Sequence, residues 1–284
     1  MEKTSNIHTS ITVIVLCAGE GTRMGKLTHA VPKPLLKIRA LNHKPILQYI
    51  IENLRRCGIA NIIVVTGHLS EKIEHFIRNF DENIVIVNLK NEYKKGPLDS
   101  FLSGLRALKF KKNRSLSEKN PVYVVIPGDT LFDVKLFEEA FTLIQEIYSE
   151  KQLKPTIFYR KISLELFVAQ KRRRDFPLII STAIIKSDDD KSFLEKIEQK
   201  IIKPSSFQGK EISQVVPIFA FPDVVINPIF HLENLVAERS LKALINRYAL
   251  EVSEVLAVKI NAQQGFFDID EKEDLNFDGL KDII

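Results

Sequence analysis

Cysteine is scarce in this chain of 284 residues, and its two copies, Cys17 and Cys57, lack the spacing of a metal site or a redox pair. This scarcity favours a reducing compartment, and we expect the protein to be cytoplasmic. The N-terminus lacks the charge and the apolar length of a secretory signal peptide. No later apolar run is long enough to cross a bilayer, so we expect no membrane partner.

Interleaved basic and aromatic residues, internal repeats and low-complexity linkers are also absent. A nucleic-acid partner is therefore not expected, and the formal charge of +5 suits an anionic small molecule. Hydrophobic residues make up 45% of the chain, which is enough for a sizeable core. We expect residues 1–10 to form a tail and residues 11–284 to form a single α/β domain.

The strongest functional pattern is a loop with the features of a phosphate-binding site. The apolar and β-branched run from Ile11 to Cys17 predicts a strand that is buried on both faces. Gly19-Glu20-Gly21-Thr22-Arg23 follows, and its glycines let an anion approach the backbone amides, while Arg23 can hold phosphate oxygens by two hydrogen bonds. Pro32-Lys33-Pro34 then fixes an extended segment that carries the Lys33 ammonium. The pattern predicts a polyphosphate site at the carboxyl end of the first strand.

Two other phosphate-binding motifs do not fit this loop. A P-loop requires four residues between its first glycine and Gly-Lys, whereas five separate Gly19 from Gly25, and Lys26 is followed by leucine. A dinucleotide fingerprint requires an acidic residue after the second strand, and the predicted strand from Asn61 to Thr66 is followed by glycine and histidine. Both folds are therefore disfavoured.

The loop resembles the signature of the sugar-phosphate nucleotidylyltransferases. The matching residues occur in register and without gaps: Leu16, Ala18, Gly19, Gly21, Thr22, Arg23, Leu27, Thr28, Pro32, Lys33, Pro34, Leu35 and Ile38. The chain departs from the signature at Cys17, Met24, Lys26 and Lys37. The Arg-Met-Gly variant also resembles cytidylyltransferases and molybdopterin-type guanylyltransferases, so this loop does not fix the nucleotide.

The resemblance implies a three-layer α/β/α Rossmann-like fold with a mostly parallel mixed sheet. It also implies transfer of a nucleoside monophosphate from an NTP to a phosphorylated sugar, with release of pyrophosphate. The expected catalytic residues are Arg23 and Lys33. The expected nucleotide-binding residues are Leu16, Ala18, Gly19, Glu20, Gly21, Thr22, Gly96 and Gly128.

Two aspartates are expected to bind Mg²⁺ or another divalent metal. Asp129 follows the predicted strand from Val122 to Pro127, where a carboxylate can help neutralise a triphosphate. Asp268 lies in a late segment, Gly265-Phe266-Phe267-Asp268-Ile269-Asp270, which resembles the element that carries the family's second metal ligand. Alternation along that segment puts Asp268 and Asp270 on one side.

The resemblance is weaker in two other segments. Gly96 precedes a predicted helix that reads the base in the family, but Pro97 replaces the usual threonine. An ordinary helix N-terminus, with proline at its first position and Asp99 in its first turn, explains this segment equally well. Ile202-Lys203-Pro204 resembles the family's Glu-Lys-Pro element near the sugar-binding strand, and this resemblance implies that Lys203 binds the acceptor phosphate. The glutamate that meets sugar hydroxyls in the family is missing here, which argues against an ordinary hexose acceptor.

Two alternatives remain open. A cytidylyltransferase that acts on a polyol or alcohol phosphate would keep the fold and change the acceptor. A catalytically silent nucleotide-sensing subunit is disfavoured, because Arg23, Lys33, Asp129 and Asp268 are all retained. The first half of the domain is expected to bind nucleotide and the second half to bind the acceptor, and homo-oligomerisation is left open.

The predicted elements outside the loop follow from hydrophobic periodicity and turn residues. Helices are expected from Lys44 to Cys57, from a Ser70 cap to Asn79, from Pro97 to about Leu108, and from Leu232 to Tyr248. Lys109 to Lys119 is expected to be a surface connection. Further strands are expected at Ile84 to Val87, Pro155 to Lys161, Leu178 to Lys186, Val215 to Phe221 and Ser253 to Ile260.

Overall fold

The computed structural model describes residues 10–115, 121–150, 152–171, 178–188, 191–202, 210–261 and 265–284. These ranges leave out Lys203 and the three arginines at 172–174. They also leave out the expected tail except for its last residue, Ser10. Among the described residues, no helix combines the length and the apolar character needed to cross a membrane.

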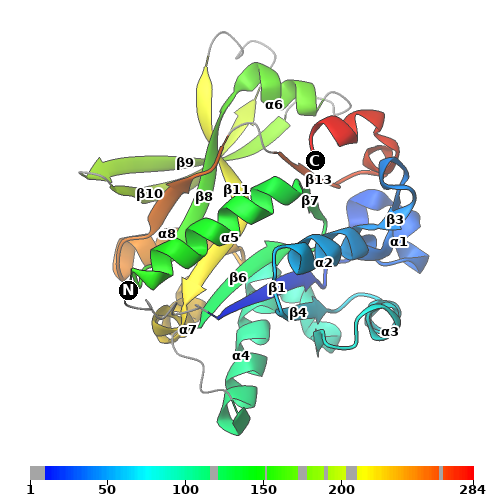
Figure 1. Cartoon of the computed structure of the whole chain (residues 1–284), viewed down its shortest axis with the longest axis horizontal. Helices are drawn as coiled ribbons and strands as arrows, with labels where there is room; N and C mark the ends of the chain where they lie inside the picture. Colours follow the sequence, from blue (N-terminus) through cyan, green and yellow to red (C-terminus); the bar gives the residue numbers. More distant parts are fainter. Residues whose placement is uncertain are drawn as a thin grey trace, which may run out of the picture.

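A parallel sheet forms the first half of the chain (Figure 1). Its strands run side by side in the order β5-β4-β1-β6, and every neighbouring pair is parallel. The strands are β1 (Ile11–Cys17), β4 (Asn61–Thr66), β5 (Val85–Asn88) and β6 (Val122–Pro127). They are connected by α2 (Ile46–Arg56), α3 (Ser70–Phe80) and α4 (Pro97–Ser115). The predicted βαβαβ order is confirmed, and it brings the ends of β1 and β6 to the same edge.

The second half continues the same sheet with mixed pairing. The order after β6 is β11-β8-β12-β10-β9. These strands are β8 (Thr156–Ser163), β9 (Leu178–Asp188), β10 (Lys191–Ile202), β11 (Glu211–Pro222) and β12 (Leu256–Lys259). Only β8 and β12 pair in parallel. Strand β10 pairs antiparallel with both β9 and β12, and β11 pairs antiparallel with both β6 and β8. The mixed sheet is confirmed, but the parallel character is confined mainly to the first half.

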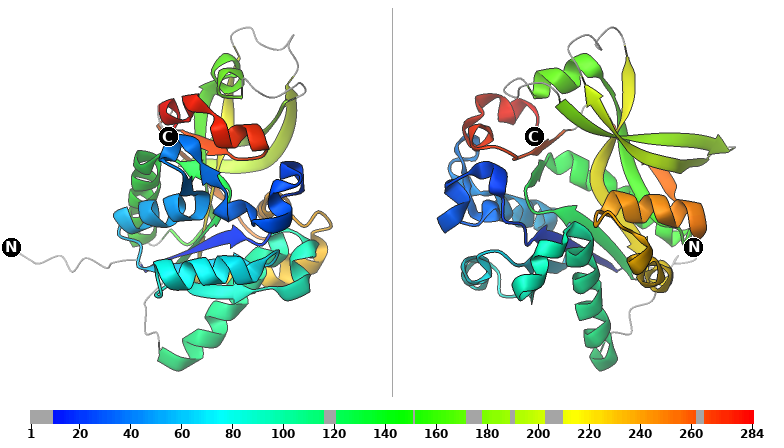
Figure 2. Two further views of the ribbon diagram at one scale, coloured as in Figure 1. Left: turned by 90° about the vertical axis from the view of Figure 1, so that its right-hand side faces the viewer. Right: turned by 180° about the vertical axis from the view of Figure 1, so that it is seen from behind.

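The long strands of the second half curl away from the parallel half (Figure 2). Strand β9 pairs with β10 along its length and also meets β11, where Thr182 lies opposite Gln214. Short elements complete the fold: α1 (Leu27–Ala30), β2 (Lys37–Ile38), β3 (Lys44–Pro45), β7 (Thr130–Phe132), α6 (Leu164–Gln170) and β13 (Phe266–Asp268).

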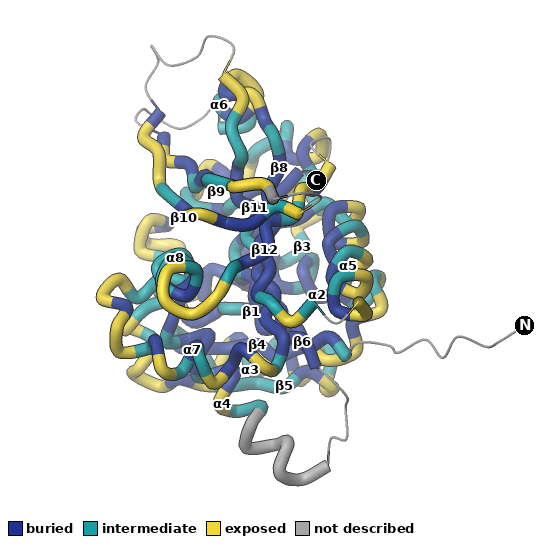
Figure 3. The backbone as a smooth tube through the Cα atoms, turned by 90° about the vertical axis from the view of Figure 1, so that its left-hand side faces the viewer, coloured by how far each residue is buried: buried dark blue, intermediate teal, exposed yellow. Residues whose placement is uncertain are grey.

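Helices cover both faces of the sheet, which confirms the three-layer prediction. One buried cluster includes residues of α2 and of α5 (Val134–Ser149), such as Leu47 and Phe137. The other includes residues of α4, α7 (Ile226–Leu232) and α8 (Leu241–Glu251), such as Phe101 and Leu244. The central strands β1 and β6 between them are buried except at Leu16 and Pro127, near their carboxyl ends (Figure 3). This burial explains why β1 is an uninterrupted apolar run.

Three predicted helices differ from the observed ones. Ser70 does not cap α3, because Leu69 occupies the cap position with a φ of 49°, and the Ser70 hydroxyl accepts a hydrogen bond from Asn88 instead. Helix α4 continues to Ser115, through part of the expected surface connection. The single helix from Leu232 to Tyr248 is wrong, because Ser240 caps α8 as a separate helix.

Candidate functional site

The conformation of the loop after β1 requires a glycine at position 21. Gly21 has a φ of +65°, and a Cβ at this position would lie 3.0 Å from Thr28 Cγ2 and 3.1 Å from Lys33 Cβ. The Thr28 hydroxyl donates to the carbonyl oxygens of Gly21 and Gly25 at 3.1 and 3.2 Å. Any side chain at position 21 would therefore push against the segment that carries Lys33.

A small pocket of about 180 Å³ lies against this loop. Its lining includes the loop, the Lys33 segment and the end of β6: Leu16, Cys17, Gly19, Gly21, Thr22, Arg23, Lys33, Pro34, Gly128, Asp129 and Asp270. The fold thus brings together most of the residues expected to hold phosphate. Gly128 fits only as glycine, since a Cβ there would lie 2.4 Å from Cys17 Sγ.

Charged side chains in the small pocket form a connected network. Lys33 Nζ lies 2.6 Å from Asp129 Oδ2 and 3.9 Å from Asp270 Oδ1. Arg23 Nη1 lies 3.1 Å from the same Asp270 oxygen. The Lys33 side chain is only 9% exposed, whereas that of Arg23 is 70% exposed. The buried lysine is therefore fixed in place, and the arginine can move to meet a ligand.

Asp129 and Asp268 lie on neighbouring backbone segments. Strand β13 pairs antiparallel with β7, which places Asp268 opposite Thr130, and the Ile269 amide donates to the Asp129 carbonyl at 3.0 Å. The Thr130 hydroxyl donates to Asp268 Oδ1 at 2.6 Å, and Lys171 Nζ lies 4.0 Å from the other oxygen. The register of two short strands thus sets the relative position of the two expected metal ligands.

The donor set fits Mg²⁺. Within the described residues, no group of three or more histidine, cysteine, aspartate or glutamate side chains is placed to hold a metal ion. Mg²⁺ in nucleotide sites usually takes only one or two carboxylates and completes its shell with phosphate oxygens and water. Burial raises the pKa of the Asp268 carboxyl, with Asp270 and Asp129 acting in the same direction and Lys171 and Thr130 opposing them. A bound cation would offset the cost of keeping this carboxylate charged.

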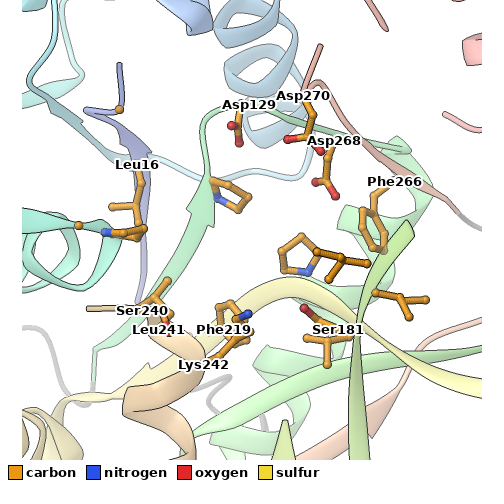
Figure 4. A pocket seen from close by; sticks show the side chains of 18 of the residues that line it. Leu16, Asp129, Ser181, Phe219, Ser240, Leu241, Lys242, Phe266, Asp268 and Asp270 are labelled. Atoms are coloured by element: carbon orange, nitrogen blue, oxygen red, sulfur yellow. The ribbon is translucent and has the colours of Figure 1, made fainter. Parts of the chain in front are cut away.

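A larger pocket of about 560 Å³ adjoins the small one (Figure 4). The two share Leu16, Gly19, Asp129 and Asp270. Asp129, Asp268 and Asp270 gather on one side of the larger pocket, and Ser240, Leu241 and Lys242 lie across from them. Its other lining residues come from both halves of the chain: Ala18, Tyr93, Gly96, Pro97, Ser100, Pro127, Phe167, Lys171, Ile179, Ile180, Ser181, Gln214, Val215, Pro217, Phe219 and Phe266.

The start of α4 and the start of α8 meet at this pocket. Gly96 has a φ of +130°, and a Cβ there would lie 2.7 Å from the Arg239 carbonyl oxygen. Asp99 accepts two hydrogen bonds from the Arg239 guanidinium, so its carboxylate has a structural partner. The interpretation of Asp99 as a first-turn acid and of Pro97 as the first helical residue matches this arrangement. Gly96 lines the larger pocket, and its contact with a nucleotide stays a prediction.

Not every predicted residue reaches a pocket. Glu20 lines neither one, and its carboxylate accepts a hydrogen bond from the Tyr93 hydroxyl at 3.3 Å. Lys203 lies outside the described residues, so the acceptor contact assigned to it stays a prediction. The other residues expected to bind nucleotide line one or both pockets, and their contact with a nucleotide stays a prediction: Leu16, Ala18, Gly19, Gly21, Thr22, Gly96 and Gly128.

Sequence reasoning missed several residues of the site. Asp270 carried a weak signal, because it alternates with Asp268. Lys171 and Lys242 carried no specific signal: Lys171 directly follows α6 and Lys242 lies in α8, so each reaches the pocket only through the packing of these helices. Arg160 carried no signal either, and it lines neither pocket but supports the wall of the larger one: it is buried, and it donates to Oε1 of the lining residue Gln214 at 2.8 Å and to Gln170 Oε1 at 3.0 Å. Burial lowers the pKa of Arg160 to about 10, against the effect of nearby Asp268.

Comparisons with solved structures show the same fold. The inositol-1-phosphate CTP transferase from T. maritima superposes with a TM-score of 0.66 at 16% identity, covering 97% of this chain and 95% of that one. The CTP:phosphocholine cytidylyltransferase from Streptococcus pneumoniae superposes with a TM-score of 0.61 at 19% identity, covering 93% and 96%. At such identities the likeness concerns the fold.

Comparisons of sequence find nucleotidylyltransferases as well. A UTP–glucose-1-phosphate uridylyltransferase from Synechocystis is 27% identical over 216 residues, which is 75% of this chain and 49% of that protein. A D-glycero-alpha-D-manno-heptose 1-phosphate guanylyltransferase from Campylobacter jejuni is 32% identical over 123 residues, 43% of this chain and 49% of that protein. The chain thus spans about half the length of these curated relatives. The model of the MobA-like NTP transferase domain matches residues 13–184, and the chain belongs to that family.

Proposed function

We propose that this protein transfers a nucleoside monophosphate from an NTP to a phosphorylated sugar, forming an NDP-sugar and pyrophosphate. The observation that carries this proposal is the junction of the two pockets at Asp129 and Asp270. The small pocket offers Arg23, Lys33 and loop amides to phosphates, and the larger one has room for a nucleoside and an acceptor. Family membership and the named relatives support the same reaction class.

The reaction requires little help from a general base, because the acceptor phosphate is already ionised. One of its oxygens attacks the α-phosphorus, and the bond from the α-phosphorus to the bridging oxygen of the β-phosphate breaks. Pyrophosphate leaves with that bridging oxygen. Catalysis then consists of positioning and of stabilising charge, which Lys33 and Arg23 supply from beside the loop.

Asp129 and Asp268 would hold Mg²⁺, which would neutralise phosphate charge when bound. In the free protein, Lys33 and Lys171 provide the nearby positive charge for these carboxylates. We place the reaction in the cytoplasm, where the free thiols of Cys17 and Cys57 would stay reduced.

The acceptor is less sharply indicated than the nucleotide site. On the side formed by β9, β11 and α6, the larger pocket is lined mainly by apolar residues: Phe167, Ile179, Ile180, Val215, Pro217 and Phe219. A hydroxyl buried without a partner costs free energy, so these walls favour an acceptor with few hydroxyl groups on that side. This observation keeps an alcohol phosphate as a second candidate, whereas a polyol phosphate is as rich in hydroxyl groups as a sugar and gains no support from these walls. Lys203 is proposed to bind the acceptor phosphate in either case.

A substrate panel tests the function directly. Each of four NTPs is combined with sugar, polyol and alcohol phosphates in Mg²⁺, and pyrophosphate release is recorded for every pair. One NTP with one acceptor should give turnover well above all others, and mass spectrometry should identify the NDP-linked product. Hydrolysis of the NTP without a linked product, or no turnover in any pair, would contradict the proposal.

A further inference from the structure

The Asp270 carboxylate lies between the two cations that the proposed function assigns to phosphate. Its Oδ1 is 3.1 Å from Arg23 Nη1 and 3.9 Å from Lys33 Nζ. Its side chain is 17% exposed and lines both pockets. A phosphate oxygen bound by Arg23 and Lys33 would take over contacts that Asp270 now makes.

The position of Asp270 is set by its own segment and not by the cations alone. The Asp274 carboxylate accepts hydrogen bonds from the amides of Asp270 and Glu271 at 2.8 and 2.9 Å, within a capping box at the start of the following turn. Asp274 is buried, and the neighbouring Ile269 amide is bonded to the Asp129 carbonyl. The backbone therefore holds the Asp270 carboxylate beside the loop whether or not a ligand is bound.

We propose that Asp270 is a positioning residue that competes with phosphate oxygens for Arg23 and Lys33. In the free protein it holds the exposed Arg23 side chain over the loop and reduces the positive charge that a stray phosphate would meet. After the reaction, the same carboxylate draws Arg23 back and thereby favours the release of pyrophosphate. The role in release rests on the proposed function, whereas the competition for the cations concerns only anion binding.

Calorimetry with pyrophosphate provides the test, first in a chelator and then in Mg²⁺. Asp270→Asn keeps the size of the side chain and removes its charge. We expect it to bind metal-free pyrophosphate roughly three- to tenfold more tightly than the wild type, the range that one or two partly exposed ion pairs supply. A merely structural role would weaken binding or leave it unchanged, whereas simple relief of charge repulsion would strengthen it equally with and without Arg23, which a double variant with Arg23→Met tests.

A matched control removes the same charge from the same segment. Glu273 is exposed and pairs only weakly with its neighbour Lys272, at 3.6 Å. Glu273→Gln should bind pyrophosphate like the wild type, which separates a local effect from a change in net charge. Adding Asp270→Asn to Arg23→Met should give a smaller gain than in the wild-type background, because one competing partner is gone.

The outcomes separate this inference from the proposed function. Equal pyrophosphate affinity in wild type and Asp270→Asn would overturn the competition, even if NMP transfer is observed. If Asp270→Asn binds pyrophosphate more weakly only when Mg²⁺ is present, Asp270 is a metal ligand and the competition is overturned. The competition is also overturned if neither protein binds pyrophosphate. A clear gain in pyrophosphate affinity in Asp270→Asn, with no NMP transfer by the wild type, would support the competition and refute the proposed reaction.

Discussion

Arg239 binds Asp99 with both arms of its guanidinium, Nε to Oδ2 at 2.9 Å and Nη2 to Oδ1 at 2.6 Å. The two residues are 140 positions apart. The Arg239 carbonyl also accepts the Leu98 amide at 3.2 Å. These contacts hold the start of α8 against the start of α4. Ser240 and Lys242 therefore line the larger pocket together with Gly96.

Replacing Arg239 by alanine should lower the free energy of unfolding by roughly 1–3 kcal/mol, because a charged, bidentate pair that is mostly shielded from water is lost. The Michaelis constant for NTP should rise, since the wall beside Gly96 loosens. Urea denaturation and steady-state kinetics measure the two effects. Arg78→Ala is the control: it removes an exposed pair with Glu74 and should cost less than about 0.5 kcal/mol. Equal losses in both variants would refute the structural role of Arg239.

Replacing Lys33 by methionine should lower kcat more than it raises KM for NTP. Methionine preserves the packing beneath Gly21, while the charge that would stabilise the transition state is lost. Initial rates over a range of NTP concentrations separate the two constants. An effect on KM alone would make Lys33 a ground-state anchor for the phosphates.

Replacing Asp129 by asparagine should reduce kcat by roughly a hundredfold or more, which is typical for the loss of a preorganised group that stabilises charge. The wild type should require a divalent metal for the same reason. Circular dichroism verifies that the variant is folded, and the metal is titrated in the activity assay. Full turnover of the variant in Mg²⁺, or of the wild type in excess chelator, would show that Asp129 holds no essential metal.

The pair between Arg55 and Asp81 should make stability depend on pH at the acidic end. Burial acts to raise the pKa of Asp81, but hydrogen bonds from Arg55 and the Asn83 amide outweigh it, so the pKa lies below that of a free aspartate. A depressed pKa in the folded state stabilises the protein above the unfolded pKa, and this stabilisation disappears as the pH falls through the folded value.

Urea denaturation of the wild type and of Asp81→Asn between pH 7 and pH 3 tests this expectation. The variant should be less stable by roughly 1 kcal/mol at pH 7, and the difference should shrink as the pH falls below about 4, the usual pKa of a free aspartate. A difference that stays constant over this range would show that ionisation of Asp81 does not contribute.

The sequence by itself determined the parts of the protein that depend on local chemistry. A short run of apolar, β-branched and aromatic residues bounded by glycine is typical of a central strand, so β1 and β6 were identified together with the loops that follow them. Glycine at position 21 and the proline-flanked Lys33 likewise indicated a phosphate-binding site. The conformational freedom of glycine and the charge of lysine are properties of the residues themselves, so the sequence shows them directly. Asp129 belongs to the same category, since it follows β6 directly.

Only the tertiary structure decided which distant residues complete the site. The pairing of Asp270 with Arg23, the arrival of Lys171 beside Asp268 and the fastening of Arg239 to Asp99 each depend on the packing of segments far apart in the chain. No local pattern records such contacts, because their geometry is fixed by the register of β13 on β7 and by the antiparallel return of β11 beside β6. The nucleotide loop is thus a property of one segment, whereas the pocket is a property of the whole fold.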